Sequence, residues 1–205
     1  MPLALEPIEL VATGRALRFV HVPLTFVTHG LSDIFANKKN KSVRETLAHP
    51  RYKSLADIVA LQHATELERP LGEFLAERKS RGDKIYVRFL NSHGDKVFCH
   101  FRMTDHPTKR KKGLYLYTLE AEVVYIGRSF DPFAKRVDQG YGKIHPKNCF
   151  IDGQSTNCHL NSMINLHAER LAFFVCPLSE DTEIAQLERA LIQERRPRWN
   201  IALAR

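Results

Sequence analysis

The sequence lacks a long hydrophobic run. The longest unbroken apolar stretch, residues 171–178, includes Pro177, and it is far shorter than the roughly 20 residues that a membrane-spanning helix needs. The N-terminus carries Glu6 and Glu9 where an export signal requires a basic segment followed by a sustained apolar one. We therefore expect a cytoplasmic protein with no membrane partner and no export signal.

Cysteine is also scarce. The chain has 4 cysteines and no C-x-x-C pair, and in a reducing cytosol such residues usually behave as small buried hydrophobes. Residues 145–159 contain two histidines and two cysteines, but their spacing matches no zinc module. The sequence therefore predicts buried thiols and gives no reason to expect zinc.

Acidic residues are fewer than basic ones. The chain of 205 residues has 31 Lys plus Arg against 23 Asp plus Glu, a net charge of +8. This balance favours a polyanionic partner, above all nucleic acid, although a merely soluble basic protein has the same balance. With 43% hydrophobic residues, the chain is expected to fold as one large domain or two small ones.

The N-terminal half predicts helices and then a β-hairpin. Helical periodicity begins at Ser54 and again after Pro70, which fits either a DNA-reading helix-turn-helix or an ordinary helical hairpin. Residues 84–103 alternate between apolar and polar side chains around a turn. Arg88 and Arg102 fall on the second face of this hairpin, which either contacts DNA or is covered by the helices.

A run of positive charge follows Pro107 and marks a domain boundary, because no core accepts consecutive cations. The sequence therefore predicts an N-terminal module over residues 1–108, for DNA recognition or another interaction, and a second domain over residues 109–205. The basic residues of this second domain that we expect to contact DNA are Lys109, Arg110, Lys111, Lys112 and Lys143.

The second domain contains two short triplets at a defined spacing. Gly113-Leu114-Tyr115 opens a strand, and Tyr125-Ile126-Gly127 closes the next one after a turn. A short helix follows, with Arg136 nine positions past the second glycine. Residues 171–176 form a third strand, and a last helix from Thr182 carries Glu188 ahead of a Pro-x-aromatic-Asn ending at Asn200.

These elements, in this order and at this spacing, resemble the GIY-YIG endonuclease family over roughly residues 110–203. The resemblance implies an α+β fold in which a three-stranded antiparallel sheet is flanked by helices. The N-terminal helix and β-hairpin module would precede this domain.

The resemblance also implies a chemistry, the metal-dependent hydrolysis of phosphodiester bonds in DNA. Glu188 would hold one Mg²⁺ or Mn²⁺, and Arg136 would bind the phosphate. Tyr115 is the first choice for the group that deprotonates or positions the attacking water, and Tyr125 is the second. Asn200 completes the residues that match the family pattern.

The sequence departs from the family pattern in two places. Many relatives carry Lys where this chain has Arg128, which can hold a phosphate but cannot accept a proton. Gly140 stands where His or Tyr is usual, so Tyr141 or His145 would have to take that catalytic role. Residues 148–165 form an inserted polar segment, which either reads DNA or caps a helix.

The sequence leaves the biological task open. It does not give the target, the choice between duplex and single-stranded DNA, or the oligomeric state. Restriction, repair and single-strand processing all agree with it, and a single chain with its own recognition module slightly favours sequence-directed cleavage. The alternative is a non-catalytic DNA-binding or adaptor protein that keeps the same fold.

Overall fold

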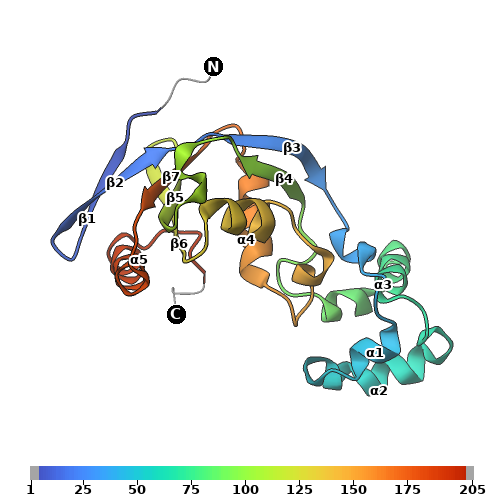
Figure 1. Cartoon of the computed structure of the whole chain (residues 1–205). Coiled ribbons are helices and arrows are strands. Elements are labelled where there is room, and N and C mark those ends of the chain that lie inside the picture. The colour runs from blue at the N-terminus through green and yellow to red at the C-terminus, as the bar shows by residue number, and fades with distance from the viewer. Residues whose placement is uncertain (1–4, 202–205) are drawn as a thin grey trace. The chain divides into compact units, whose positions relative to one another are not determined.

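The chain forms an α+β structure of two compact units, each built from segments that are distant in sequence (Figure 1). The computed structural model describes residues 5–201. The boundary expected between residues 108 and 109 falls inside a continuous stretch of one unit, so the units do not follow the predicted division. Unit 1 contains the described residues up to 29, residues 99–143 and those from 163 onward, and unit 2 contains residues 30–98 and 144–162.

Unit 1 contains a five-stranded antiparallel sheet with the strand order β1-β2-β7-β5-β6. The three strands predicted in the second half of the chain are confirmed as its β7-β5-β6 part. The expected limit of three strands is wrong, because β2 pairs with β7 and adds a hairpin from the N-terminus. The strands are β1 (Ile8–Ala12), β2 (Arg15–His21), β5 (Gly113–Leu119), β6 (Glu122–Ser129) and β7 (Leu171–Pro177).

The N-terminal hairpin depends on its turn. Thr13 and Gly14 both have positive φ angles, 50° and 77°, which is the conformation that a tight two-residue hairpin turn requires. The turn aligns Ala12 with Arg15 and directs β2 back along β1. Two strands of the N-terminal segment, β1 and β2, therefore belong to the sheet of unit 1.

The predicted last helix is confirmed as α5 (Asp181–Arg195), and it covers one face of the sheet. Leu187 and Leu191 of α5 pack with Leu116 and Ile126 in one hydrophobic core. Figure 1 shows α5 in red beside the strands that it covers. All residues of β5 are buried, because β5 has strand neighbours on both edges and contacts on both faces.

The predicted β-hairpin over residues 84–103 is wrong. Its first half, Lys84–Phe89, is a 3₁₀ helix that begins at Asp83, whose carboxylate accepts a hydrogen bond from the Ile85 backbone N–H at 2.9 Å. Its second half is β4 (Phe98–Met103), which pairs with β3 (Leu24–Leu31) in a two-stranded sheet. The capped 3₁₀ helix buries Ile85 and Tyr86 together.

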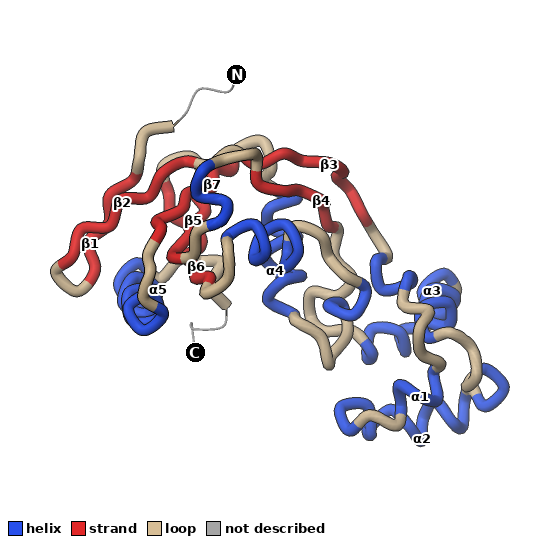
Figure 2. The backbone as a smooth tube through the Cα atoms, in the orientation of Figure 1, coloured by secondary structure: helices blue, strands red, loops and turns tan. Residues whose placement is uncertain are grey.

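Unit 2 is mostly helical around an aromatic core, as the blue segments of Figure 2 show. The two helices predicted in this region are confirmed as α2 (Lys53–Gln62) and α3 (Leu71–Ser80). A shorter helix, α1 (Val43–Leu47), precedes them, and the inserted polar segment forms most of α4 (Ser155–Leu166). The core contains Phe35, Tyr52, Phe74, Phe89 and Phe150, all with at most 1% exposure.

All 4 cysteines are buried, as predicted. Within residues 5–201, the structure contains no helix that is both long and apolar enough to cross a membrane.

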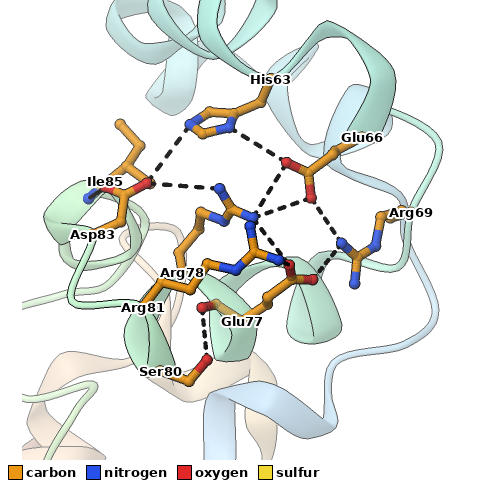
Figure 3. Close-up of polar contacts among 9 residues, drawn as sticks. All are labelled: His63, Glu66, Arg69, Glu77, Arg78, Ser80, Arg81, Asp83 and Ile85. Carbon is orange, nitrogen blue, oxygen red and sulfur yellow. Dashed lines mark hydrogen bonds and ion pairs between the residues drawn. The ribbon is translucent and has the colours of Figure 1, made fainter.

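A network of charged side chains links α3 to the segment that precedes it (Figure 3). Arg78, whose side chain is only 9% exposed, contacts Glu66 at 3.4 Å and Glu77 at 3.2 Å. Arg69 bridges the same two carboxylates at 2.7 and 2.6 Å. The guanidinium of Arg78 also lies 5.5 Å from the Phe74 ring. The buried guanidinium of Arg78 is therefore stabilised by two carboxylates and one aromatic ring.

Replacing Arg78 with methionine is expected to destabilise the protein by about 3 kcal/mol, because the change removes the buried charge that contacts both carboxylates, and the arginines that remain beside them are more exposed. Urea unfolding followed by circular dichroism measures the effect. Arg81→Met is the matched control, since Arg81 also pairs with Glu77 but its side chain is 64% exposed. Equal losses for the two variants would contradict a special role for the buried charge.

Candidate active site

The two tyrosines of the triplets lie on one face of the sheet. In the antiparallel register Tyr115 is opposite Gly127, and Tyr117 is opposite Tyr125. The rings of Tyr115 and Tyr125 are stacked with their centroids 6.0 Å apart. A Cβ atom on Gly127 would lie 2.6 Å from Cζ of Tyr115 and 2.7 Å from its hydroxyl oxygen. The second glycine of the motif therefore makes room for the tyrosine of the first.

Replacing Gly127 with alanine is expected to displace the Tyr115 ring and to destabilise unit 1 by about 1–3 kcal/mol, since both atoms nearest to the new Cβ belong to a buried ring. Thermal unfolding measures this loss. Gly140→Ala is the control, because the nearest atom to a Cβ there is 3.7 Å away, an ordinary contact. A Gly127→Ala variant as stable as the control would show that the ring can move freely.

Arg136 lies beside the tyrosines on a π-helix, Lys135–Tyr141. In this helix the Gly142 N–H donates to the Val137 carbonyl at 2.6 Å, and such wide turns are rare and often mark functional sites. The Nε of Arg136 donates a hydrogen bond to the Tyr115 hydroxyl at 3.2 Å. The neighbouring tyrosines, Tyr115 first, raise the pKa of Arg136 above its usual value. The guanidinium is therefore a fixed positive charge.

Tyr141 packs with its ring against both Tyr115 and Arg136. It is fully buried, its ring stacks on Tyr115 with centroids 6.1 Å apart, and the Arg136 guanidinium lies 5.4 Å from its centre. Its hydroxyl is 2.9 Å from that of Tyr117. Burial raises the pKa of Tyr117, Tyr125 and Tyr141 well above 10. These three hydroxyls therefore stay protonated and are poor candidates for a base.

Glu188 and Arg128 form an ion pair on the helix-covered side of the sheet. Arg128 follows Gly127 on β6 and is opposite Leu114 in the register, so its side chain leaves from the face that α5 covers. Its Nη1 donates to Oε2 of Glu188 at 2.6 Å. The side chain of Glu188 is only 12% exposed. Burial raises the pKa of Glu188, and the charge of Arg128 opposes this shift.

The two sides of the sheet are electrostatically coupled at this point. The charge of Arg136 lowers the pKa of Glu188, in opposition to burial, and the charge of Glu188 raises the pKa of Tyr125. Strand β6 is an edge strand of the described sheet. The charges of Arg136 and Glu188 therefore act on one another.

Asn200 binds the backbone rather than another side chain of the cluster. Its amide accepts a hydrogen bond from the Ile126 N–H at 3.0 Å and donates to the Ile126 carbonyl at 2.7 Å. The Trp199 N–H donates to the Val124 carbonyl at 3.0 Å. These bonds satisfy the open edge of β6, which would otherwise expose unpaired backbone groups. Both of these amide bonds of Asn200, which was predicted as catalytic, are therefore with the backbone of β6.

Several predicted site residues are not part of this cluster. His145 belongs to unit 2, where its Nδ1 accepts a hydrogen bond from the Lys147 N–H at 3.3 Å. Arg88 lies on the 3₁₀ helix of unit 2, whereas Arg102 lies on β4 in unit 1. These two arginines therefore do not share a hairpin face. Lys143 is exposed in unit 1.

The basic run 109–112 is bound into unit 1 and does not form a loose linker. It continues from a 3₁₀ helix, Pro107–Arg110, directly into β5. The Lys111 carbonyl accepts from the Phe133 N–H at 2.8 Å, and the Lys112 carbonyl accepts from the Leu178 N–H at 3.0 Å. Their consecutive positive charges predicted a domain boundary here, but their backbone hydrogen bonds make them part of unit 1.

The sequence reasoning missed Tyr117 as a part of the cluster. The signal was present, because residues 115 and 117 share one face of a strand, and Tyr117 carries the hydroxyl that meets Tyr141.

No protein-family model matches the chain, and neither the curated proteins nor the solved structures compared with it include a match. The geometry of the cluster therefore carries the functional argument alone.

Proposed function

We propose that this chain is a metal-dependent DNA endonuclease of the GIY-YIG type, a hydrolase that cleaves phosphodiester bonds. The observation that carries the proposal is Arg136, whose guanidinium bonds to the Tyr115 hydroxyl and acts electrostatically on the Glu188 carboxylate. A fixed cation, a phenol and a carboxylate in one region are the groups that phosphodiester hydrolysis requires. The net charge of +8 suits DNA as the substrate.

In this proposal Arg136 binds the nonbridging oxygens of the scissile phosphate. Its charge does not titrate near neutral pH, so it stabilises the negative charge that grows in the transition state. Tyr115 positions the attacking water, because its hydroxyl is the one that receives the Arg136 hydrogen bond. Because the hydroxyl accepts this bond, its own proton is left for a different acceptor.

Glu188 would hold the divalent ion. A single carboxylate is a fitting ligand for Mg²⁺ or Mn²⁺, since Mg²⁺ keeps most of its waters and binds through one or two carboxylates. When bound, the ion supplies positive charge to the leaving 3′ oxygen. Arg128 holds Oε2 of Glu188 at 2.6 Å, so it orients the carboxylate and competes with the ion for that oxygen.

Burial of the charged groups favours catalysis over a purely structural use of this fold. Arg136 is half-buried and Glu188 is buried. Removing two charges from water costs free energy, and such buried charges cluster at functional sites. A non-catalytic DNA-binding protein would bind phosphates equally well with exposed lysines. The cluster therefore supports an enzyme better than an adaptor.

The proposal is tested by incubating the purified chain with duplex and single-stranded DNA in Mg²⁺ or Mn²⁺ and mapping the ends. We expect cleavage that depends on the divalent ion and stops in EDTA. Binding to both DNA forms without cleavage under any of these conditions would favour the adaptor. Full cleavage in EDTA would exclude the metal role of Glu188.

A further inference from the structure

A basic groove of about 650 Å³ lies at one end of the unit 1 sheet. It is formed where β5 begins and where β6 and β7 end, since Gly113 is in register with both Ser129 and Pro177. The cluster described above does not include this groove. The side chains that give it chemical character are Arg15, Arg110, Lys111, Lys112, Phe130 and Glu183.

Two of the four cations in the groove are neutralised and two are not. Arg15 pairs with Glu183, and Lys112 pairs with Asp181 at 2.7 Å. Arg110 and Lys111 are exposed, and no ion pair joins either of them to a described residue. Their backbone is fixed, because residue 111 is hydrogen-bonded to Phe133. The groove therefore presents two adjacent free cations on a rigid support.

An exposed aromatic ring lies in the same groove. Phe130 is 46% exposed, which is unusual for so large an apolar side chain. The Arg128 guanidinium lies 5.2 Å from its ring centre, and the same guanidinium pairs with Glu188. The groove is thus joined to the proposed metal ligand through one arginine.

We propose that this groove binds unpaired nucleotides of the strand to be cut, an inference that rests on the proposed nuclease function. Arg110 and Lys111 hold successive phosphates, and the ring of Phe130 stacks on a base. Free cations beside an aromatic ring are the arrangement by which proteins hold single strands. A paired base inside a duplex has both faces covered, so only an unpaired base can stack on Phe130.

The test measures DNA binding by fluorescence anisotropy in EDTA, so that no cleavage occurs. The probes are a labelled oligothymidylate and a labelled duplex of equal phosphate number, with the full chain and its Phe130→Leu and Phe130→Trp variants. We expect Phe130→Leu to weaken single-strand binding by roughly 5- to 100-fold, the range for loss of one stacked base, and to change duplex binding little. Phe130→Trp restores stacking and is expected to bind like the wild type.

Charge is tested separately. The double variant Arg110→Ala with Lys111→Ala is expected to lower the salt dependence of single-strand binding by about 1.4 log units per log unit of salt, roughly 0.7 for each phosphate that the variant no longer binds. The matched control is Arg170→Ala with Arg198→Ala. Those arginines pair with Glu120 and Glu122, at the opposite end of β5 and β6, so the control removes equal charge away from the groove.

Three outcomes would overturn the groove proposal. The first is that Phe130→Leu binds single strands as tightly as the wild type. The second is that Phe130→Leu loses as much affinity for the duplex as for the single strand, which would assign the groove to paired DNA. The third is that the two double variants change the salt dependence equally. Thermal unfolding of each variant, together with the Phe130→Trp rescue, excludes a folding defect. A chain that passes these binding tests but never cleaves DNA would overturn the nuclease proposal and leave the groove as a binding site.

Discussion

Replacing Arg136 with alanine is expected to lower the rate of DNA cleavage by about 10²- to 10³-fold, the usual cost of removing one preorganised group that stabilises transition-state charge. The guanidinium is held by the Tyr115 hydroxyl at 3.2 Å and by the Tyr141 ring at 5.4 Å. A group held this rigidly contributes more as the phosphate gains charge than it does to initial binding. DNA affinity, measured in EDTA, should therefore change little.

Two further variants test this reasoning. Lys135→Ala removes a neighbouring charge that is 60% exposed and paired with Asp131, and it should cleave at the wild-type rate. Arg136→Lys keeps the charge but lacks the planar fork, so it should recover only part of the lost rate. If Arg136→Ala cleaves as fast as the wild type, Arg136 is not the phosphate ligand.

Replacing Glu188 with glutamine should abolish metal-dependent cleavage and leave DNA binding largely intact. The change keeps the volume of a side chain that is only 12% exposed, but the neutral amide is a poor ligand for Mg²⁺ compared with a carboxylate. The Arg128 guanidinium loses its charged partner at the same time. Single-turnover cleavage across a range of Mg²⁺ concentrations measures the effect, and excess metal should not restore it.

The control for this variant is Glu194→Gln, on the exposed side of the same helix. It makes the same chemical change without touching Arg128, so its metal dependence should match that of the wild type. Direct titration with Mn²⁺ should show a binding site in the wild type and in Glu194→Gln that is lost in Glu188→Gln. Retention of that site in Glu188→Gln would move the metal to another ligand.

The sequence predicted the elements whose signals are local. The pair β5 and β6 was predicted because apolar residues and tyrosines mark both strands around the short turn at residues 120–121. Helices α2, α3 and α5 were predicted from their helical periodicity. The motif spacing also predicted Arg136 near Tyr115, and the Arg136 Nε donates a hydrogen bond to the Tyr115 hydroxyl.

The errors came from features that a local pattern does not encode. Residues 84–89 alternate like a strand, but the carboxylate of Asp83 begins a 3₁₀ helix there. The pairing of β2 with β7 joins Val20 to Val175, and no short-range signal predicts a partner so distant in sequence. The role of Gly127 was likewise hidden, since the space it provides is needed by a ring on the neighbouring strand.

The division of unit 1 among three separate segments also determines when the site can form during synthesis. Glu188 lies on the last helix, and Asn200 fastens the edge of β6. A growing chain therefore carries Tyr115 and Arg136 for many residues before it can complete the sheet or bring the carboxylate into place. Domains fold during translation as their parts emerge from the ribosome. A site built in this order is complete only once the chain has been synthesised through residue 200.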